Sequence, residues 1–305
     1  MRLRASGLAA ASLLAVASCF AAREAVASSV CGCDPAASTL GVERPGADSF
    51  RLAVENRYLW KESGLGSAAE TEREDRLLMR LQYAAAEPLV LQIEAPFYLS
   101  KNLVHFHGAT SVDDTARGPG DATVGARYEL LRAGARQTLA VTGILKLPTG
   151  ANNRSSGGEP PHEHQQLGSG AFDQLLGLNY VYDAEPWTLY GSMTGRLNGT
   201  NSRGFRYGHS VVGTAGARRT LLDGGRLLLS LEAQLRAAGA DRFADGSHDP
   251  NTGGRLLYAT AGTGFAFTRQ FAMYVLLQVP VAKHLHGVQT EHPVAYGMLS
   301  YDLPL

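Results

Sequence analysis

The sequence predicts an all-β protein, a single antiparallel transmembrane β-barrel of about twelve strands. Three observations predict it. Between residues 49 and 305 the chain divides into twelve segments in which apolar and polar residues mostly alternate, the connections alternate between short and long, and aromatic residues gather near the segment ends. This combination is typical of bacterial outer-membrane barrels, which have short periplasmic turns and longer external loops.

The alternation is clearest in the first segment. Successive side chains of a strand point to opposite faces, so an apolar and a polar face result. The apolar face holds Phe50, Leu52, Val54, Tyr58 and Trp60, and the other holds Arg51, Ala53, Glu55 and Arg57. A soluble β-sandwich alternates in the same way, so this pattern alone does not decide between the two folds.

The connections favour the barrel. Tight ones lie at 85–88, 133–136, 183–185, 222–224 and 269–270, and longer ones at 61–75, 101–119, 148–169, 198–204, 237–253 and 284–291. If the first strand runs outward, all long loops are external and both termini are periplasmic.

Aromatic residues on the apolar parity predict two interfacial girdles. The outer girdle would contain Trp60, Phe97, Phe172, Phe205 and Tyr207, and the inner one Tyr83, Tyr180, Tyr182, Trp187, Phe265, Phe267, Phe271 and Tyr301. The alternative is that these are scattered core aromatics of a soluble β-protein.

The net charge and the apolar runs of the sequence limit the classes of binding partner that we expect. Lys plus Arg and Asp plus Glu both number 28, so the net charge is zero and we expect no nucleic-acid partner. Beyond the leader no apolar run approaches the length of a spanning helix. The expected partners are outer-membrane lipid, the outer-membrane assembly machinery, and a small-molecule or metal substrate.

The N-terminus has the pattern of a secretory signal peptide covering residues 1–27. Arg2 and Arg4 precede an apolar stretch at 8–17, and Ala25-Val26-Ala27 precedes Ser28 as a small-x-small cleavage site. The alternative is lipidation at Cys19, since Val16-Ala17-Ser18-Cys19 forms an acceptable lipobox. Residues 28–48 would be a periplasmic segment, and residues 49–305 the barrel.

Two further cysteines, Cys31 and Cys33, lie in the 28–48 segment. In an oxidising periplasm they could form a strained local disulfide, bind a soft metal such as Cu(I), or pair with another protein. A small disulfide or an inert tail is the simpler alternative.

Polar-parity charges predict a lumen that leans cationic and modestly favours anions. The basic set is Arg51, Arg57, Arg76, Arg80, Arg127, Lys146, Arg196, Arg206, Arg218, Arg226 and Arg236, and the acidic set is Glu55, Glu94, Asp121, Glu129, Asp173, Glu232 and Asp302. The alternative is a packed ladder in which these charges neutralise one another. Segments such as 254–268 are apolar on both faces, so we expect part of the lumen to be apolar or plugged.

All nine histidines fall in predicted external loops or the outer parts of strands. Six form His-x-His pairs, in which both imidazoles point the same way on an extended chain. The pairs are His105 and His107, His162 and His164, and His284 and His286. Imidazole suits zinc, copper and nickel, so the pairs predict metal capture at the barrel mouth. The alternative is that polar external loops simply tolerate histidine, and no cofactor is required.

An enzyme is not expected. His209-Ser210 resembles a base and nucleophile, but adjacent strand residues face opposite ways and no Asn or Asp lies nearby to orient the histidine.

Three glycine-containing stretches lie within about residues 118–182: Gly118–Tyr128, Lys146–Gly150 and Leu167–Asp173. In their order and spacing they resemble the transporter-like outer-membrane family named after the meta-pathway of phenol degradation. The resemblance implies an outer-membrane barrel that transports small, sometimes aromatic, compounds. Unlike most such barrels, the chain ends in Leu305 instead of an aromatic residue. Either the assembly machinery reads Leu305, or the last strand is irregular near Pro304.

These observations predict a channel or transporter that passes small molecules by diffusion, with metal capture at a His-rich mouth. The alternative is a non-conducting barrel that displays a metal- or partner-binding surface.

Overall fold

The computed structural model describes residues 45, 48–66, 69–107, 110–134, 136–155, 163–222 and 226–304. The predicted signal peptide, Cys19, Cys31 and Cys33 lie outside these residues. The elements are β1 (Ser49–Ser63), β2 (Glu70–Ala86), β3 (Leu89–His107), β4 (Thr110–Pro119), β5 (Thr123–Ala133), β6 (Gln137–Lys146), the short 3-10 helix η3 (Glu163–Gln165), β7 (Asp173–Ala184), β8 (Trp187–Leu197), β9 (Ser210–Leu221), β10 (Leu227–Ala238), β11 (Gly254–Ala266), β12 (Phe271–Leu285), β13 (Gln289–Glu291) and β14 (Val294–Pro304).

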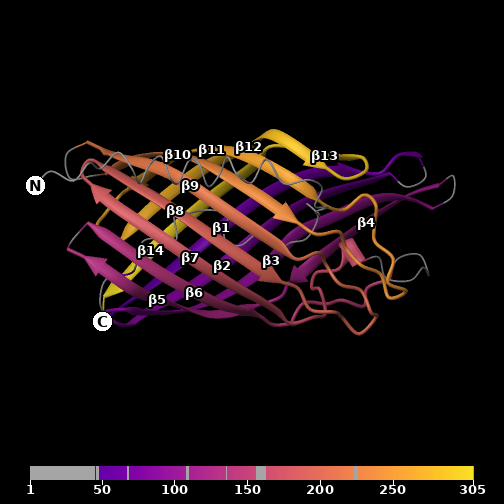
Figure 1. Ribbon diagram of the computed structural model, residues 1–305, viewed down its shortest axis with the longest axis horizontal. Coiled ribbons are helices and arrows are strands. Elements are labelled where there is room, and N and C mark those ends of the chain that lie inside the picture. Colours follow the sequence, from indigo (N-terminus) through magenta and orange to yellow (C-terminus); the bar gives the residue numbers. More distant parts are fainter. Residues whose placement is uncertain are drawn as a thin grey trace, which may run out of the picture.

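Twelve of these strands close into one antiparallel barrel (Figure 1). Each pairs with its neighbour along the chain, and β1 pairs with both β2 and β14. The remaining two strands lie beside this wall, because β4 pairs only with β3 and β13 with β1. The predicted twelve-stranded antiparallel barrel is confirmed. The last strand stays in register as far as Pro304, which pairs with Ser49.

The connections separate by length between the two ends of the barrel. Figure 1 shows the tight turns at the end where β14 finishes, and the long connections with η3 at the other end. Two predicted loops, 61–75 and 101–119, are wrong. Residues up to Ser63 and from Glu70 belong to the β1–β2 hairpin, and residues up to His107 pair with β4. These segments were predicted as loops because they are rich in polar residues. They still form strands, because backbone hydrogen bonds between strands do not require an apolar face.

The predicted connection at 284–291 is shifted to 286–293, because β12 runs to Leu285 and β14 begins at Val294, and it contains the short strand β13.

The barrel is apolar outside and polar inside. In β2, for example, Arg76, Arg80 and Gln82 are buried, whereas Met79 and Leu81 are 45% and 41% exposed. Leu176 and Leu231 on other strands are each 69% exposed. A continuous apolar outer face of this kind marks a surface that is covered by lipid or another apolar partner. Among the described residues no helix is long and apolar enough to cross a membrane.

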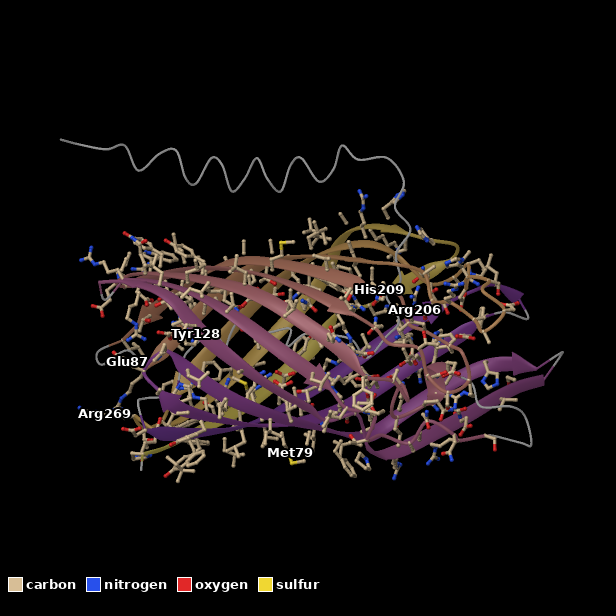
Figure 2. All side chains as sticks on the ribbon, turned by 60° about the horizontal axis from the view of Figure 1, so that its bottom comes forward. Met79, Glu87, Tyr128, Arg206, His209 and Arg269 are labelled. Carbon is tan, nitrogen blue, oxygen red and sulfur yellow. The ribbon has the colours of Figure 1, made fainter. Side chains whose placement is uncertain are left out.

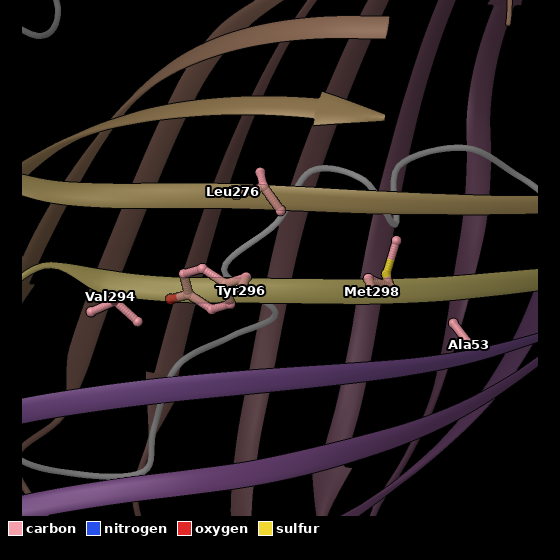
Figure 3. Close-up of a cluster of buried hydrophobic side chains, with 5 residues drawn as sticks. All are labelled: Ala53, Leu276, Val294, Tyr296 and Met298. Carbon is pink, nitrogen blue, oxygen red and sulfur yellow. The ribbon is translucent and has the colours of Figure 1, made fainter. Parts of the chain in front are cut away.

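Part of the inner face is apolar. Ala53 of β1, Leu276 of β12, and Val294, Tyr296 and Met298 of β14 form a buried cluster on adjacent strands (Figure 3). Leu256 and Tyr258 of β11 are buried as well. The expectation that segment 254–268 contributes apolar side chains to the interior therefore agrees with the structure.

The aromatic girdles are confirmed in part. Phe97 and Phe172 are exposed on the outer face, as are Trp187, Phe267 and Tyr301 toward the other end. The assignment of Phe205 and Tyr207 to the outer girdle is wrong, because both are buried within the connection between β8 and β9, where they pack on His164. The alternation of inward and outward side chains along the strands does not continue through that connection.

Candidate functional site

Most of the predicted lumen charges are buried in the barrel. They are Arg57, Arg76, Arg80, Glu94, Arg127, Lys146, Arg196 and Glu232, each at most 9% exposed. Arg51 is only partly buried and pairs with Asp302 at 2.6 Å, next to the tight turns. Arg226 is exposed immediately before β10, at the end of the barrel with the tight turns. Arg206 also lies elsewhere, in the connection between β8 and β9.

Five buried strand charges were missed because they fall in segments predicted as loops. They are Lys61, Glu72, Glu74, Lys101 and Glu291. Lys61 Nζ lies 2.8 Å from Glu72 Oε2, and Arg57 donates to Glu74. Alternation continuing past residue 61 was the signal that could have placed them.

The interior charges form a ladder of ion pairs across β1 to β8. Arg80 Nε donates to Glu94 Oε1 at 2.6 Å. Farther along, Lys146 Nζ lies 2.6 Å from Asp121 Oδ2 and 3.0 Å from Asp173 Oδ2, and Arg196 Nη2 lies 2.5 Å from the same Asp173 oxygen. Buried charges are stable only when they are paired in this way.

The ladder is close to neutral. Eight basic and seven acidic side chains are buried among the described strand residues. This balance favours the alternative of mutually neutralising charges over a lumen that leans cationic.

The wall formed by β9 to β14 is mostly uncharged. Gln278 Nε2 donates to Gln234 Oε1 at 3.2 Å, and the Tyr296 hydroxyl donates to Gln278 Oε1 at 3.2 Å. Glu232, one of its two buried strand acids, accepts from the Tyr190 hydroxyl at 2.8 Å. Because the barrel is closed, this amide and hydroxyl wall faces the charged wall across the interior.

The three stretches that carry the family resemblance meet around Asp121. Asp121 Oδ1 accepts a hydrogen bond from Gly150 N at 2.9 Å, and Oδ2 accepts from Ser169 N at 2.8 Å and from Lys146 Nζ. A Cβ on Gly168 would lie 2.3 Å from Asp121 Oδ1 and 2.6 Å from Gly150 O. The Gly-rich motifs therefore permit close backbone packing where β5, β6 and β7 meet their loops.

His164 holds a loop across the mouth. Its Nε2 lies 3.1 Å from Asp241 Oδ2, and its Nδ1 lies 3.6 Å from Glu70 Oε2 of β2. Burial lowers the pKa of His164, but the hydrogen bonds with Asp241 and Glu70 outweigh burial and raise the pKa to about 10. The neighbouring Glu163 pairs with Arg203 at 2.6 Å. The mouth is thus crossed by charged contacts between distant segments.

Among the predicted metal ligands that the structure describes, His105, His164, His284 and His286 do not form a metal-binding group. His164 is buried and bonded to carboxylates, and His284 is exposed; burial and His284 lower the pKa of His286. Within the described part of the chain, no group of three or more His, Cys, Asp or Glu side chains could hold a metal ion. His162, Cys31 and Cys33, the side chain of His107 and any contact they make with His105 lie outside the description. Metal capture therefore stays a prediction.

His209 and Ser210 do not face each other. His209 is exposed and its Nδ1 accepts from Asn198 N at 3.0 Å, whereas Ser210 is buried. This placement agrees with the strand argument against a paired base and nucleophile.

Comparison with known proteins identifies the fold. No protein-family model matches the chain, and no curated protein matches it in sequence. The crystal structure of an outer membrane channel from Pseudomonas putida F1 is similar over 88% of this chain and 99% of that one, with a TM-score of 0.68 and 17% identity. The translocator domain of the autotransporter NalP from Neisseria meningitidis is similar over 88% and 92%, with a TM-score of 0.52 and 11% identity. The chain therefore has the fold of bacterial outer-membrane β-barrels.

Proposed function

We propose that this protein is an outer-membrane channel that passes small molecules by diffusion through a narrow, charge-lined lumen. The observation that carries the proposal is the inverted barrel, with apolar side chains exposed outside and ion-paired side chains buried inside. That arrangement suits lipid outside and a polar path inside. The similar Pseudomonas structure is itself an outer membrane channel, which supports the same role here.

The proposed orientation places the long connections and η3 outside the cell and both termini in the periplasm. The separation of long and short connections supports it, because outer-membrane barrels carry their longer loops externally. It also makes the outer-membrane assembly machinery and outer-membrane lipid the expected partners.

The near-neutral ladder implies weak charge selectivity. Rings of one sign of charge select ions of the other sign, but here Glu72, Glu94 and Asp173 each lie beside a base. We therefore expect similar permeability for small cations and anions, and exclusion by size in a twelve-stranded barrel.

A second candidate is a non-conducting barrel that displays a binding surface. The burial of the interior charges favours it, because Glu74 and Asp173 each retain only 1% of their accessible surface. The His164 contacts across the mouth favour it as well.

Single-channel recording of the refolded protein in planar bilayers separates these candidates. Discrete conductance steps with a reversal potential near zero in a salt gradient are expected for the channel. Heat-modifiable, folded protein that produces no steps would establish the second candidate instead.

Zinc, copper and nickel test the histidine prediction separately. Block of the steps, together with micromolar binding by calorimetry, is expected if the mouth captures a metal. Absence of binding for all three ions would contradict metal capture.

A further inference from the structure

A row of basic side chains lies on the outer side of the long connections. Arg206 and Arg242 exchange backbone hydrogen bonds of 2.9 and 2.8 Å, so they stand directly opposite each other. Arg242 is in turn bridged to His248. Residues directly opposite each other on antiparallel chains share a face, and their Cα atoms lie about 4.5–5.5 Å apart. We name Arg206, Arg242 and His248 the cationic row.

The cationic row faces away from the barrel mouth. Phe205, Tyr207 and Asp241, which alternate with Arg206 and Arg242, are all buried against His164 in the mouth. Alternation places the row on the opposite face. Arg242 and His248 are exposed there. The predicted position of Arg206 in the lumen is therefore wrong, because strand parity reverses between Arg206 and β9.

No ion pair joins Arg206 or Arg242 to an acidic side chain of the described residues. Like charges directly opposite each other destabilise a strand pair. Asp245 accepts from the Ser247 hydroxyl and Asp249 accepts from Asn251 N, and among the described contacts neither carboxylate forms an ion pair with Arg206 or Arg242. Arg206 Nε is buried and makes no hydrogen bond with the described residues. An arrangement of donors that repel one another and lack acceptors suits an anion with several oxygens.

The row adjoins the lipid-facing wall. Arg206 precedes β9 by a few residues, and the exposed His209 between them leads to Val211, which is 41% exposed. Figure 2 shows Arg206 and His209 close together toward the long-loop end, far from Glu87 and Arg269. Burial and the charge of Arg206 lower the pKa of His209, so the positive field of Arg206 extends to the edge of the wall.

We infer that the cationic row binds the phosphate groups of a phosphorylated, multiply acylated glycolipid of the outer leaflet, the lipid A part of lipopolysaccharide. The guanidinium groups of Arg206 and Arg242 donate to phosphate oxygens, and the acyl chains lie along the apolar outer face below. This occupant supplies the negative charge that the row lacks and the apolar chains that the wall requires. The inference rests on the proposed orientation, in which this end faces the outer leaflet.

Binding of purified lipid A to the detergent-solubilised full chain tests the inference, with native mass spectrometry as the readout. The comparison uses bisphosphorylated lipid A, the same lipid with its phosphates removed, and inorganic phosphate alone. The double variant Arg206→Gln, Arg242→Gln is expected to bind bisphosphorylated lipid A at least about tenfold more weakly, as loss of two charge-assisted contacts implies. Wild-type protein should bind the dephosphorylated lipid as weakly as the double variant does.

Arg219→Gln is the matched control. Arg219 is also an exposed arginine of the same wall, but it lies near the tight turns and over the Trp187 ring. An equal loss in Arg219→Gln would show general charge attraction and overturn the inference. So would unchanged binding in the double variant, or binding of inorganic phosphate alone as tight as that of the lipid.

Folding and channel activity are checked separately. Heat-modifiable migration shows whether each variant is folded, and Arg242→Gln alone, at an exposed position, serves if the double variant fails to fold. A wild-type barrel that binds lipid A but never conducts would overturn the proposed channel and leave this inference standing.

Discussion

Gly168 shows how one missing side chain permits the contacts around Asp121. Gly168 lies against Gly150, whose N donates to Asp121 Oδ1, and both neighbours are too close for a Cβ. Movement of the Gly150 backbone oxygen away from Gly168 would disturb the hydrogen bonds that Gly150 N and Ser169 N donate to Asp121. The resemblance motifs are thus explained by packing at one point.

Gly168→Ala is therefore expected to destabilise the folded barrel by about 1–3 kcal/mol, the usual cost of overpacking. Gly143→Ala is the control, because a Cβ on Gly143 of β6 meets nothing within 4 Å. Equilibrium unfolding of the refolded proteins in denaturant measures both. Equal stability of the two variants would show that the close approach at Gly168 is not needed.

The sequence predicted whether an individual side chain faces inward or outward only where the strand alternation was regular. Arg80 lies inside as expected, because it alternates with the apolar Met79 and Leu81, which face outward. Arg206 was misplaced because parity does not pass through the irregular stretch before β9. Bonds between distant segments, such as His164 with Asp241 and Glu70, cannot be read from local pattern at all.

At the scale of elements, the twelve barrel strands were predictable and their upper extensions were not. An apolar face identifies the part of a strand in contact with lipid. The extensions of β1, β2 and β3, and all of β4, carry polar residues that alternate weakly with apolar ones. Glu72 and Lys101 were missed for this reason, although both belong to the interior ladder.

The segment that carries η3 depends on one buried histidine. His164 is held between Asp241 and Glu70, and nearby Leu167 N donates to Ala151 O at 3.0 Å while the Leu167 side chain packs with Tyr98 and Ala116. His164→Gln is expected to speed amide hydrogen exchange at residues 164–167 by tenfold or more, while the barrel strands stay protected. His248→Gln, at an exposed loop position, should leave exchange there unchanged.

The same element should loosen at high pH. The pKa of His164 is raised from its ordinary value of 6.5 to about 10, so its stabilising charge is fully present below pH 6.5 and is lost as the pH rises through 10. Exchange at residues 164–167, corrected for the intrinsic effect of pH, should therefore increase between pH 7 and 10 in the wild type and stay flat in His164→Gln. A flat wild-type profile would show that the ion pairs of His164 do not hold the segment.

At the scale of the whole molecule, the distribution of polarity distinguishes a membrane barrel from a soluble one. The neutral interior ladder and the apolar exterior are two consequences of one alternating sequence. In water, the exposed leucines would be a liability, whereas in a bilayer they anchor the protein. The loss of folding free energy on placing a charged residue on the outer face should therefore depend more on where the residue lies along the barrel than on its exposed fraction.

Leu231 and Leu65 allow that idea to be tested at matched exposure. Leu231 lies in β10 and is 69% exposed, whereas Leu65 lies at the tip of the β1–β2 hairpin and is 70% exposed. Leu231→Arg is expected to destabilise bilayer-folded protein by about 2–4 kcal/mol, because its charge enters the hydrocarbon region, and Leu65→Arg by close to nothing. Reversible unfolding in guanidinium from lipid vesicles measures the difference. Equal, small losses for both variants would place β10 in water and contradict the membrane-spanning barrel, since the two substitutions differ mainly in where they lie along it.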